Sequence, residues 1–360
     1  MPSPQTPAAA AGTWPLGDLT VNRLGFGAMR LTGSVPFGNG TPSDRGQSIA
    51  VLRRAVGLGV NHIDTAAFYF SPLRSANELI STALAPYPDD LVITTKVSPG
   101  RDAWGEWYSA RPDQLRGQVE ENLRQLGRDH LDVVNLRRRP RQESIAEHFG
   151  ALAELRDAGL IRHLGVSDVT VAQLDEARAI APVVCVQNRY GLDLREHDEV
   201  LRACAERSIA FVPFSAIAGP SRGSGSRPSD PGQLLEVAGR HQATAAQIRL
   251  AWTLHQAPNV LAIPGTGDVR HLEQNVAAAA IRLTVEDLTL LDSLSPVLRV
   301  PAPYRVPGDG HQGGGEQQVD PGLDALERPV PPARLVGDGL AEPRRLQAGL
   351  DGSQRVAPGG

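Results

Sequence analysis

Short, continuous apolar runs alternate along most of the chain with longer segments whose apolar residues recur at helical spacing. Such runs are typical of parallel strands buried on both faces, and the segments between them are typical of amphipathic helices. A small hairpin at 16–24 and a strand near Leu24 come first. The further predicted strands are 61–64, 91–96, 132–136, 163–167, 183–187, 210–214 and 260–263. The predicted helices are 48–58, 75–84, 112–126, 144–158, 171–180, 198–207, 243–256, 269–280 and 284–294.

This regular alternation implies a parallel sheet, because each helix carries the chain back to the same end of the sheet. Eight such units over about 260 residues fit a closed (β/α)8 barrel better than an open sheet. The competing doubly wound fold would want a Gly-x-Gly-x-x-Gly turn after the first strand, and Gly25-Phe26-Gly27 does not supply it. The sequence therefore predicts a (β/α)8 TIM barrel.

The two ends of the chain lack this pattern. Residues 1–12 are rich in Pro and Ala and lack the basic start and apolar core of a signal peptide, so we predict a disordered leader. Between 301 and 360, 21 residues are Gly or Pro, a share above the ~25–30% typical of disordered sequence. The predicted organisation is a leader at 1–12, a barrel at 13–298, and a disordered, Gly- and Pro-rich tail at 299–360.

Charge and cysteine content narrow the function. The net charge of −4 and the pI of about 6.2 argue against a general nucleic-acid binder, which needs a basic surface. No apolar run reaches the roughly 18 residues of a membrane helix. Cys185 and Cys204 have no metal-type spacing, so we expect a reducing cytoplasm and no metal. We therefore expect a cytoplasmic protein with a small-molecule substrate, and the oligomeric state stays open.

An acid, a phenol and an amine lie where predicted strands end. In a (β/α)8 barrel the active site forms at the carboxyl ends of the strands. Asp64 ends one strand, Tyr69 follows five residues later, and Lys96 ends the next strand. A neighbouring Lys96 ammonium lowers the pKa of the phenol, and Asp64 keeps that lysine charged, which suits protonation of a carbonyl oxygen during reduction. Singly, these side chains can cap a turn, pack a loop or end a strand in solvent; their joint placement favours catalysis.

The period of two along a strand tests this idea, because alternate side chains share a face. Polar or aromatic residues end further strands on the corresponding face: Arg137, Ser167, Gln187 and Phe214. We therefore expect a ring of functional groups around one mouth of the barrel. His62 and Cys185 share this parity, but they fit a core histidine and a small core residue better than a ligand and a nucleophile.

Several separated motifs resemble, in order, those of the aldo-keto reductase superfamily over roughly 14–295. They are Asn-His-Ile-Asp-Thr-Ala at 61–66 followed by Tyr69, Thr-Thr-Lys at 94–96, Leu-Asp-Val-Val-Asn-Leu at 131–136, Gly-Val-Ser-Asp at 165–168, Val-Gln-Asn-Arg-Tyr at 186–190, and Ile-Pro-Gly-Thr at 263–266 with Asn275. The resemblance implies a (β/α)8 fold and NADPH-dependent interconversion of a carbonyl and an alcohol. It also implies that Tyr69 is the proton donor and that Asp64 and Lys96 tune it.

The same resemblance implies a site for NADP along the mouth. Ser167, Asp168 and Gln187 would hold the nicotinamide carboxamide, and Phe214 would stack on the ring. The loop at 215–233, which begins at Ser215, would cover the pyrophosphate. The residues implied for the adenosine end are Thr266, Arg270, His271, Gln274 and Asn275, at the start of a helix whose amides and dipole favour phosphate.

Three positions depart from the family pattern. Arg137 replaces the usual catalytic histidine; it cannot titrate at working pH, but it can donate hydrogen bonds to a carbonyl oxygen. Gly265 stands where many members have a lysine for the 2′-phosphate, and Arg270 or His271 can substitute. Asp168 replaces an asparagine. We expect reduction of an aldehyde or ketone, with two alternatives: an NADPH-binding regulatory or interaction protein with little turnover, and a reductase of an activated C=C bond.

Overall fold

The computed structural model describes residues 7–33, 41–102, 106–139, 141–217 and 230–294, all within one compact unit. The tail predicted at 299–360 and the first six residues of the predicted leader lie outside these ranges. Within the described ranges, no helix combines the length and the apolar character that crossing a membrane requires.

Seven parallel strands form one curved sheet at the centre of this unit. In spatial order they are β3 (Phe26–Gly27), β4 (His62–Asp64), β7 (Val92–Val97), β10 (Leu131–Arg137), β11 (Ile161–Ser167), β12 (Val183–Gln187) and β13 (Ala210–Phe211). The side chains of β4 and β7 are buried throughout, as expected for strands covered on both faces.

The segment at 260–262 closes this sheet into a barrel. Val260 pairs in parallel with Phe211 of the last strand, and Ala262 pairs in parallel with Leu24 beside the first. The Leu261 amide donates to Phe211 O at 2.9 Å, and the Ala262 amide donates to Arg23 O at 2.8 Å. This confirms the predicted (β/α)8 barrel, in which the predicted strand at 260–263 is reduced to single bridges.

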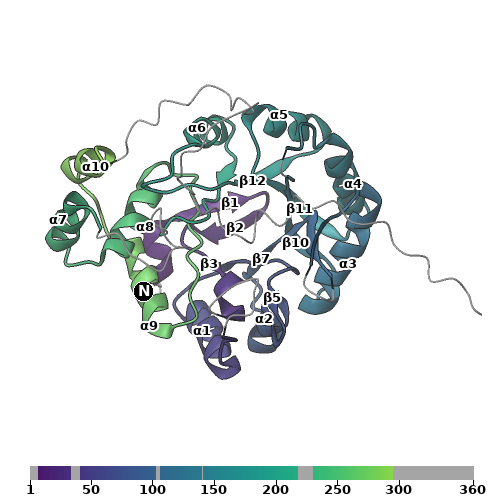
Figure 1. The fold of residues 1–360 in the computed structure, drawn as a ribbon, viewed down its shortest axis with the longest axis horizontal. Coiled ribbons are helices and arrows are strands. Elements are labelled where there is room, and N and C mark those ends of the chain that lie inside the picture. The colour runs from purple at the N-terminus through teal and green to yellow at the C-terminus, as the bar shows by residue number, and fades with distance from the viewer. Residues whose placement is uncertain (1–6, 34–40, 103–105, 140, 218–229, 295–360) are drawn as a thin grey trace, which may run out of the picture. The chain divides into compact units, whose positions relative to one another are not determined.

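Helices follow the strands in the order that the sequence predicts, and they surround the barrel (Figure 1). They are α1 (Arg45–Gly57), α2 (Ala76–Leu84), α3 (Leu115–Leu126), α4 (Ala146–Asp157), α5 (Val171–Ile180), α6 (Asp198–Glu206), α7 (Gly232–Arg240), α8 (Ala245–His255), α9 (Val269–Ala277) and α10 (Val285–Asp292). Side chains of Ser75, Thr170, Thr244 and Thr284 accept hydrogen bonds from amides in the first turns of α2, α5, α8 and α10. Such caps explain why these helices begin where they do.

A helix and two hairpins of the structure are absent from the sequence prediction. Helix α7 begins at Gly232, inside the segment assigned to the loop at 215–233. Two small antiparallel hairpins also form, β5 (Phe70–Ser71) with β6 (Arg74–Ser75), and β8 (Pro99–Arg101) with β9 (Trp107–Ser109). Both hairpins follow barrel strands at their carboxyl ends, so they add side chains near the predicted site.

The predicted N-terminal hairpin forms, but it begins earlier than the predicted 16–24: it pairs β1 (Thr13–Leu16) with β2 (Leu19–Asn22). Leu16 and Val21 of this hairpin are completely buried and belong to one apolar cluster with interior residues of the barrel strands. The other fully or mostly buried members of this cluster are Val92, Val133, Cys185, Ala210, Val212 and Leu261. The barrel interior at this hairpin is therefore a packed core.

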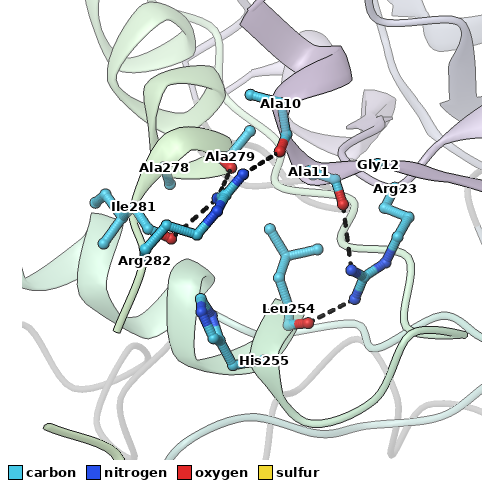
Figure 2. Close-up of a pocket in the computed structure, with 10 residues that line it drawn as sticks. All are labelled: Ala10, Ala11, Gly12, Arg23, Leu254, His255, Ala278, Ala279, Ile281 and Arg282. Carbon is cyan, nitrogen blue, oxygen red and sulfur yellow. Dashed lines mark hydrogen bonds between the residues drawn. The ribbon is translucent and has the colours of Figure 1, made fainter. Parts of the chain in front are cut away.

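The predicted disorder of the leader is wrong for the last part of it. Pro7–Ala11 form a 3-10 helix, η1, in which Ala8 is completely buried. Arg23 and Arg282 attach this helix to the barrel from two sides of a cavity of ≈ 320 Å³ (Figure 2). Arg23 donates to Ala11 O at 3.2 Å, and Arg282 donates to Ala10 O at 2.6 Å. These backbone contacts order a segment that composition alone marks as unstructured.

Candidate active site

Asp64 and Lys96 form a buried ion pair at the carboxyl ends of β4 and β7. The Nζ of Lys96 lies 2.6 Å from Oδ1 of Asp64, and each side chain is at most 5% exposed. Lys96 also donates to Thr65 O at 3.1 Å, and Gln187 at the end of β12 donates through Nε2 to Oδ2 of Asp64 at 2.7 Å. A buried pair is stable only when further hydrogen bonds satisfy it. Here they involve the Thr65 carbonyl just after β4 and Gln187 at the end of β12.

Tyr69 lies against this pair. Its ring centroid is 4.9 Å from the Nζ of Lys96, which also hydrogen-bonds the phenol. Phe68 packs edge-on against the Tyr69 ring at 5.1 Å, and Trp107 of β9 packs against Phe68 at 5.6 Å. The structure thus brings together the three residues that the sequence proposed for proton transfer.

Opposing influences set the protonation of this trio. Burial raises the pKa of Tyr69, and this outweighs the lowering by the Lys96 charge and hydrogen bond and by the Arg137 charge. Burial by itself lowers the pKa of Lys96, but the charge of Asp64 and the contacts with Tyr69 raise it above its ordinary value. Lys96 does lower the pKa of the phenol, as predicted, but this is only one of several contributions. Their sum raises the pKa, so the phenol stays protonated at neutral pH.

Two other buried side chains beside the trio, His62 and Cys185, are uncharged. Burial lowers the pKa of His62 to about 4, so its ring is neutral, and its Nε2 lies 3.2 Å from the Thr94 hydroxyl. Burial raises the pKa of Cys185, whose thiol donates to Oδ1 of Asn135 at 3.2 Å. These contacts agree with the interpretation of both residues as part of the core.

Arg137 completes the mouth between β7 and β11. Its Nη1 donates to the Ser167 hydroxyl at 3.2 Å, and its Nη2 lies 3.8 Å from Oδ2 of Asp168. Its guanidinium lies 4.9 Å from the ring centroid of Phe214. Arg138, which sequence reasoning did not single out, holds the same Asp168 with its Nη2 3.6 Å from Oδ2. The Arg137 side chain is 12% exposed, so it is part of the site wall.

The residues predicted for the nicotinamide end also meet at this mouth. Ser167 is in register with Arg137 on one side and with Gln187 on the other. Asp168 and Ser215 both have left-handed backbone, with φ of 62° and 67°. The Asp168 amide donates to Gln187 O at 3.0 Å, which fixes the turn after β11.

The donor set at this place fits a flat ring that carries a carboxamide. The Ser167 hydroxyl can donate or accept, and the Phe214 ring offers an aromatic face. The Gln187 nitrogen is bound to Asp64, and no described residue donates to its carbonyl oxygen, so that oxygen can accept from a carboxamide NH2.

The residues predicted for the adenosine end lie on and just before α9. Thr266 precedes the helix, Arg270 and His271 lie in its first turn, and Gln274 and Asn275 lie in its second half. Asp268 caps this helix, since its Oδ1 accepts from the amides of Arg270 at 2.8 Å and His271 at 3.1 Å. The first amides of α9, which were expected to bind a phosphate, therefore already donate to the Asp268 carboxylate. The Arg270 side chain is 86% exposed and remains a cation at this place, 3.8 Å from Asp268.

Sequence reasoning also missed Arg101 on the hairpin β8–β9. Its Nη1 donates to Phe70 O at 2.5 Å, and its guanidinium stacks 4.2 Å from the Phe70 ring centroid. Trp107 lies 5.7 Å from the same guanidinium. Arg101 does not stand at the end of a predicted barrel strand, so the sequence pattern did not point to it. The folded structure brings its hairpin next to the trio through the contact between Trp107 and Phe68.

Comparison with known proteins places this geometry in a family. The model of the aldo/keto reductase family matches residues 23–296. The pyridoxine 4-dehydrogenase of Escherichia coli (strain K12) is 44% identical over 293 residues, which cover 79% of this chain and 99% of that protein. An uncharacterized oxidoreductase of Schizosaccharomyces pombe is 40% identical over 287 residues, covering 79% of this chain and 90% of that protein.

Solved structures agree with the sequence comparisons. A thermostable aldo-keto reductase in complex with the inhibitor epalrestat aligns with a TM-score of 0.64 and 31% identity, covering 78% of this chain and 97% of that one. An aldo/keto reductase from Klebsiella pneumoniae in complex with NADP and acetate aligns with a TM-score of 0.64 and 27% identity, covering 77% and 93%.

Proposed function

Because the chain belongs to the aldo/keto reductase family, we propose that it interconverts an aldehyde or ketone and the corresponding alcohol with NADP(H), with Tyr69 as the proton donor. One observation carries the proposal: a protonated, buried phenol lies against the buried pair of Lys96 and Asp64. This arrangement serves an oxygen that gains negative charge, because it holds a proton ready and a cation behind it.

In the proposed reduction, bound NADPH supplies a hydride to the carbonyl carbon. Tyr69 gives its proton to the carbonyl oxygen, and Lys96 stabilises the phenolate left behind, since its ammonium contacts the ring and the oxygen. Asp64 and Gln187 hold the ammonium in place through the contacts at 2.6 Å and 2.7 Å. Arg137 adds a permanent positive charge that acts on Tyr69.

Pyridoxal is the first substrate that we propose, with pyridoxine as its alcohol. Support comes from the 44% identity with a pyridoxine 4-dehydrogenase that this chain covers almost end to end. The side chains near Tyr69 suit an aromatic ring, because Phe68 and Trp107 are aromatic and Arg101 stacks on such faces.

NADPH is the proposed cofactor, with Ser167, Asp168, Gln187, Phe214 and Ser215 at the nicotinamide and pyrophosphate. Related structures from Klebsiella pneumoniae hold NADP or NADPH. In this chain the exposed Arg270 supports the proposal, because a guanidinium binds phosphate in a bidentate manner. Thr266, His271, Gln274 and Asn275 complete the proposed adenosine end. Separate titrations with NADPH and NADH test the preference, and equal affinity for both would contradict it.

The proposed reaction is tested with the purified chain by following NADPH oxidation with pyridoxal, simple aldehydes, ketones and enones. Turnover with pyridoxal or another carbonyl compound is the expected result. Binding of NADPH without turnover on any carbonyl would support the regulatory alternative, and turnover on enones alone would support reduction of a C=C bond.

A further inference from the structure

Arg137 contacts three groups on which the proposed nicotinamide site depends. It donates to the Ser167 hydroxyl at 3.2 Å, lies 3.8 Å from the Asp168 carboxylate, and stacks 4.9 Å from the Phe214 ring centroid. A nicotinamide ring on Phe214 must therefore share its surroundings with this guanidinium. The inference below rests on the proposed function, because it takes the nicotinamide to bind there.

The position of Arg137 is fixed by the barrel. It is the last residue of β10, and its backbone is in register with Ser167 of β11 and follows a strand that is buried throughout. A ring that takes the face of Phe214 can turn the guanidinium aside, but the side chain still starts beside Ser167. Its positive charge therefore stays within the reach of one arginine side chain from Ser167.

Neighbouring charges leave a positive excess at this place. Lys96 and Asp64 neutralise each other at 2.6 Å. Arg137 and Arg138 share the single carboxylate of Asp168, at 3.8 Å and 3.6 Å. The site is largely buried, so solvent screens the remaining charge less than at a surface.

We propose that Arg137 makes this site discriminate between the two redox states of the cofactor by charge, and that it favours the reduced form. The reduced nicotinamide ring is uncharged and the oxidised ring carries one positive charge. Repulsion between that ring and Arg137 raises the Kd of NADP+ without raising the Kd of NADPH. The product of carbonyl reduction is thus released more readily than NADPH, and the enzyme is biased toward reduction at equal cofactor concentrations.

Isothermal titration calorimetry of the full chain at fixed ionic strength measures the Kd of NADP+ and of NADPH. We expect the ratio Kd(NADP+)/Kd(NADPH) to fall at least about tenfold in Arg137→Met, because two unit charges about 10 Å apart at an effective dielectric constant of about 20 change a Kd by about that factor. Arg137→Lys keeps the charge and is expected to keep most of the ratio. Arg116→Met removes an exposed cation of α3 and is expected to leave the ratio unchanged.

Arg137→His gives an independent test, because histidine can lose its charge. In this variant the ratio should be low at pH 8 and rise as the pH falls below the imidazole pKa. In the wild type, where arginine stays charged, the ratio should not change over that range. This comparison uses a single folded variant at several pH values, so it holds even where Arg137→Met fails to fold.

The possible outcomes separate this inference from the proposed function. An unchanged ratio in Arg137→Met, or a pH-independent ratio in Arg137→His, overturns the inference. If the wild type still turns over pyridoxal in that case, the proposed function stands. The expected changes in a protein without turnover would support the inference and overturn the proposed reaction. Failure of the wild type to bind either form of the cofactor overturns both.

Discussion

Oδ2 of Asp64 accepts a hydrogen bond from Nε2 of Gln187 at 2.7 Å, although the two residues are 123 positions apart in the chain. The other oxygen of the same carboxylate holds Lys96. One buried side chain therefore connects the ends of β4, β7 and β12. The same contacts that orient the proposed proton donor also contribute to the stability of the barrel, and the two contributions can be measured separately.

Replacing Lys96 by Met should destabilise the protein by about 3–5 kcal/mol, because it leaves the carboxylate of Asp64 buried without its countercharge. Urea unfolding of the wild type and the variant measures the difference. Arg54→Met is the matched control, since the Arg54–Glu273 pair is equally short at 2.7 Å but nearly half exposed. Its loss should cost less than about 1 kcal/mol. Equal costs for the two variants would mean that burial does not decide the strength of the Lys96 pair.

Tyr69→Phe should lower the rate of carbonyl reduction about 10²- to 10⁴-fold, the usual contribution of a positioned general acid. The affinity for NADPH should change little, because the ring and its packing against Phe68 remain. Steady-state assays and a fluorescence titration with NADPH check the two parts. Tyr87→Phe removes another partly buried hydroxyl, which donates to Leu126 O at 2.6 Å, and should leave the rate unchanged. A normal rate in Tyr69→Phe would exclude this residue as the proton donor.

Arg23→Met should destabilise the protein by about 2–6 kcal/mol, since each of its four hydrogen bonds to main-chain carbonyls contributes a net of about 0.5–1.5 kcal/mol. Arg23 donates to Ala11 O, Leu254 O, Ala257 O and Val260 O, so its loss affects η1, the end of α8 and the closing segment together. Thermal and urea unfolding measure the cost. Arg116→Met on the exposed face of α3 should be nearly neutral, and a similarly small effect at Arg23 would show that solvent replaces its four contacts.

Asp287 should give the fold a pH-dependent contribution at low pH. Burial raises its pKa, but hydrogen bonds from His241, Arg240 and Thr284 outweigh this and lower it from 3.8 to about 2. A depressed folded-state pKa stabilises the protein above the unfolded-state value and the contribution is lost as the pH falls toward 2. Between pH 5 and pH 3 the wild type should lose about 1 kcal/mol of unfolding free energy through this residue. Asp287→Asn should lose correspondingly less over the same range, and identical pH slopes would contradict the assignment.

The barrel was predictable because its signal repeats. The structure confirms β12 at Val183–Gln187 and α5 at Val171–Ile180 with the bounds that the sequence predicts. The apolar runs and the helix caps there agree with each other, so local and global preferences coincide. The same regularity placed Asp64 and Lys96 at neighbouring strand ends, which the register of β4 with β7 then brings together.

The remaining features depend on contacts that no local pattern encodes. Helix α7 begins with Gly232 next to a Gly-, Ser- and Pro-rich stretch, and its burial of Leu234 and Val237 comes from packing on α8 and α10. The hairpin that carries Arg101 pairs this residue with Trp107 and has no apolar alternation of its own. Asp268 stands directly before α9, where a carboxylate commonly caps a helix, so it competes with a phosphate for the amides of the first turn.

The carboxylate that connects three strand ends also limits how this enzyme can evolve. Under the proposed mechanism, a substitution at Asp64 or Lys96 is expected to lower both activity and stability, so single, individually tolerated steps should rarely pass through these two positions. Arg137 and the hairpin β8–β9 do not combine a catalytic with a stabilising role in this way, because they do not connect the strands that Asp64 connects. Changes of substrate and of cofactor affinity should therefore accumulate there, and laboratory selections that begin with libraries at these positions should recover folded variants far more often than libraries at the ion pair.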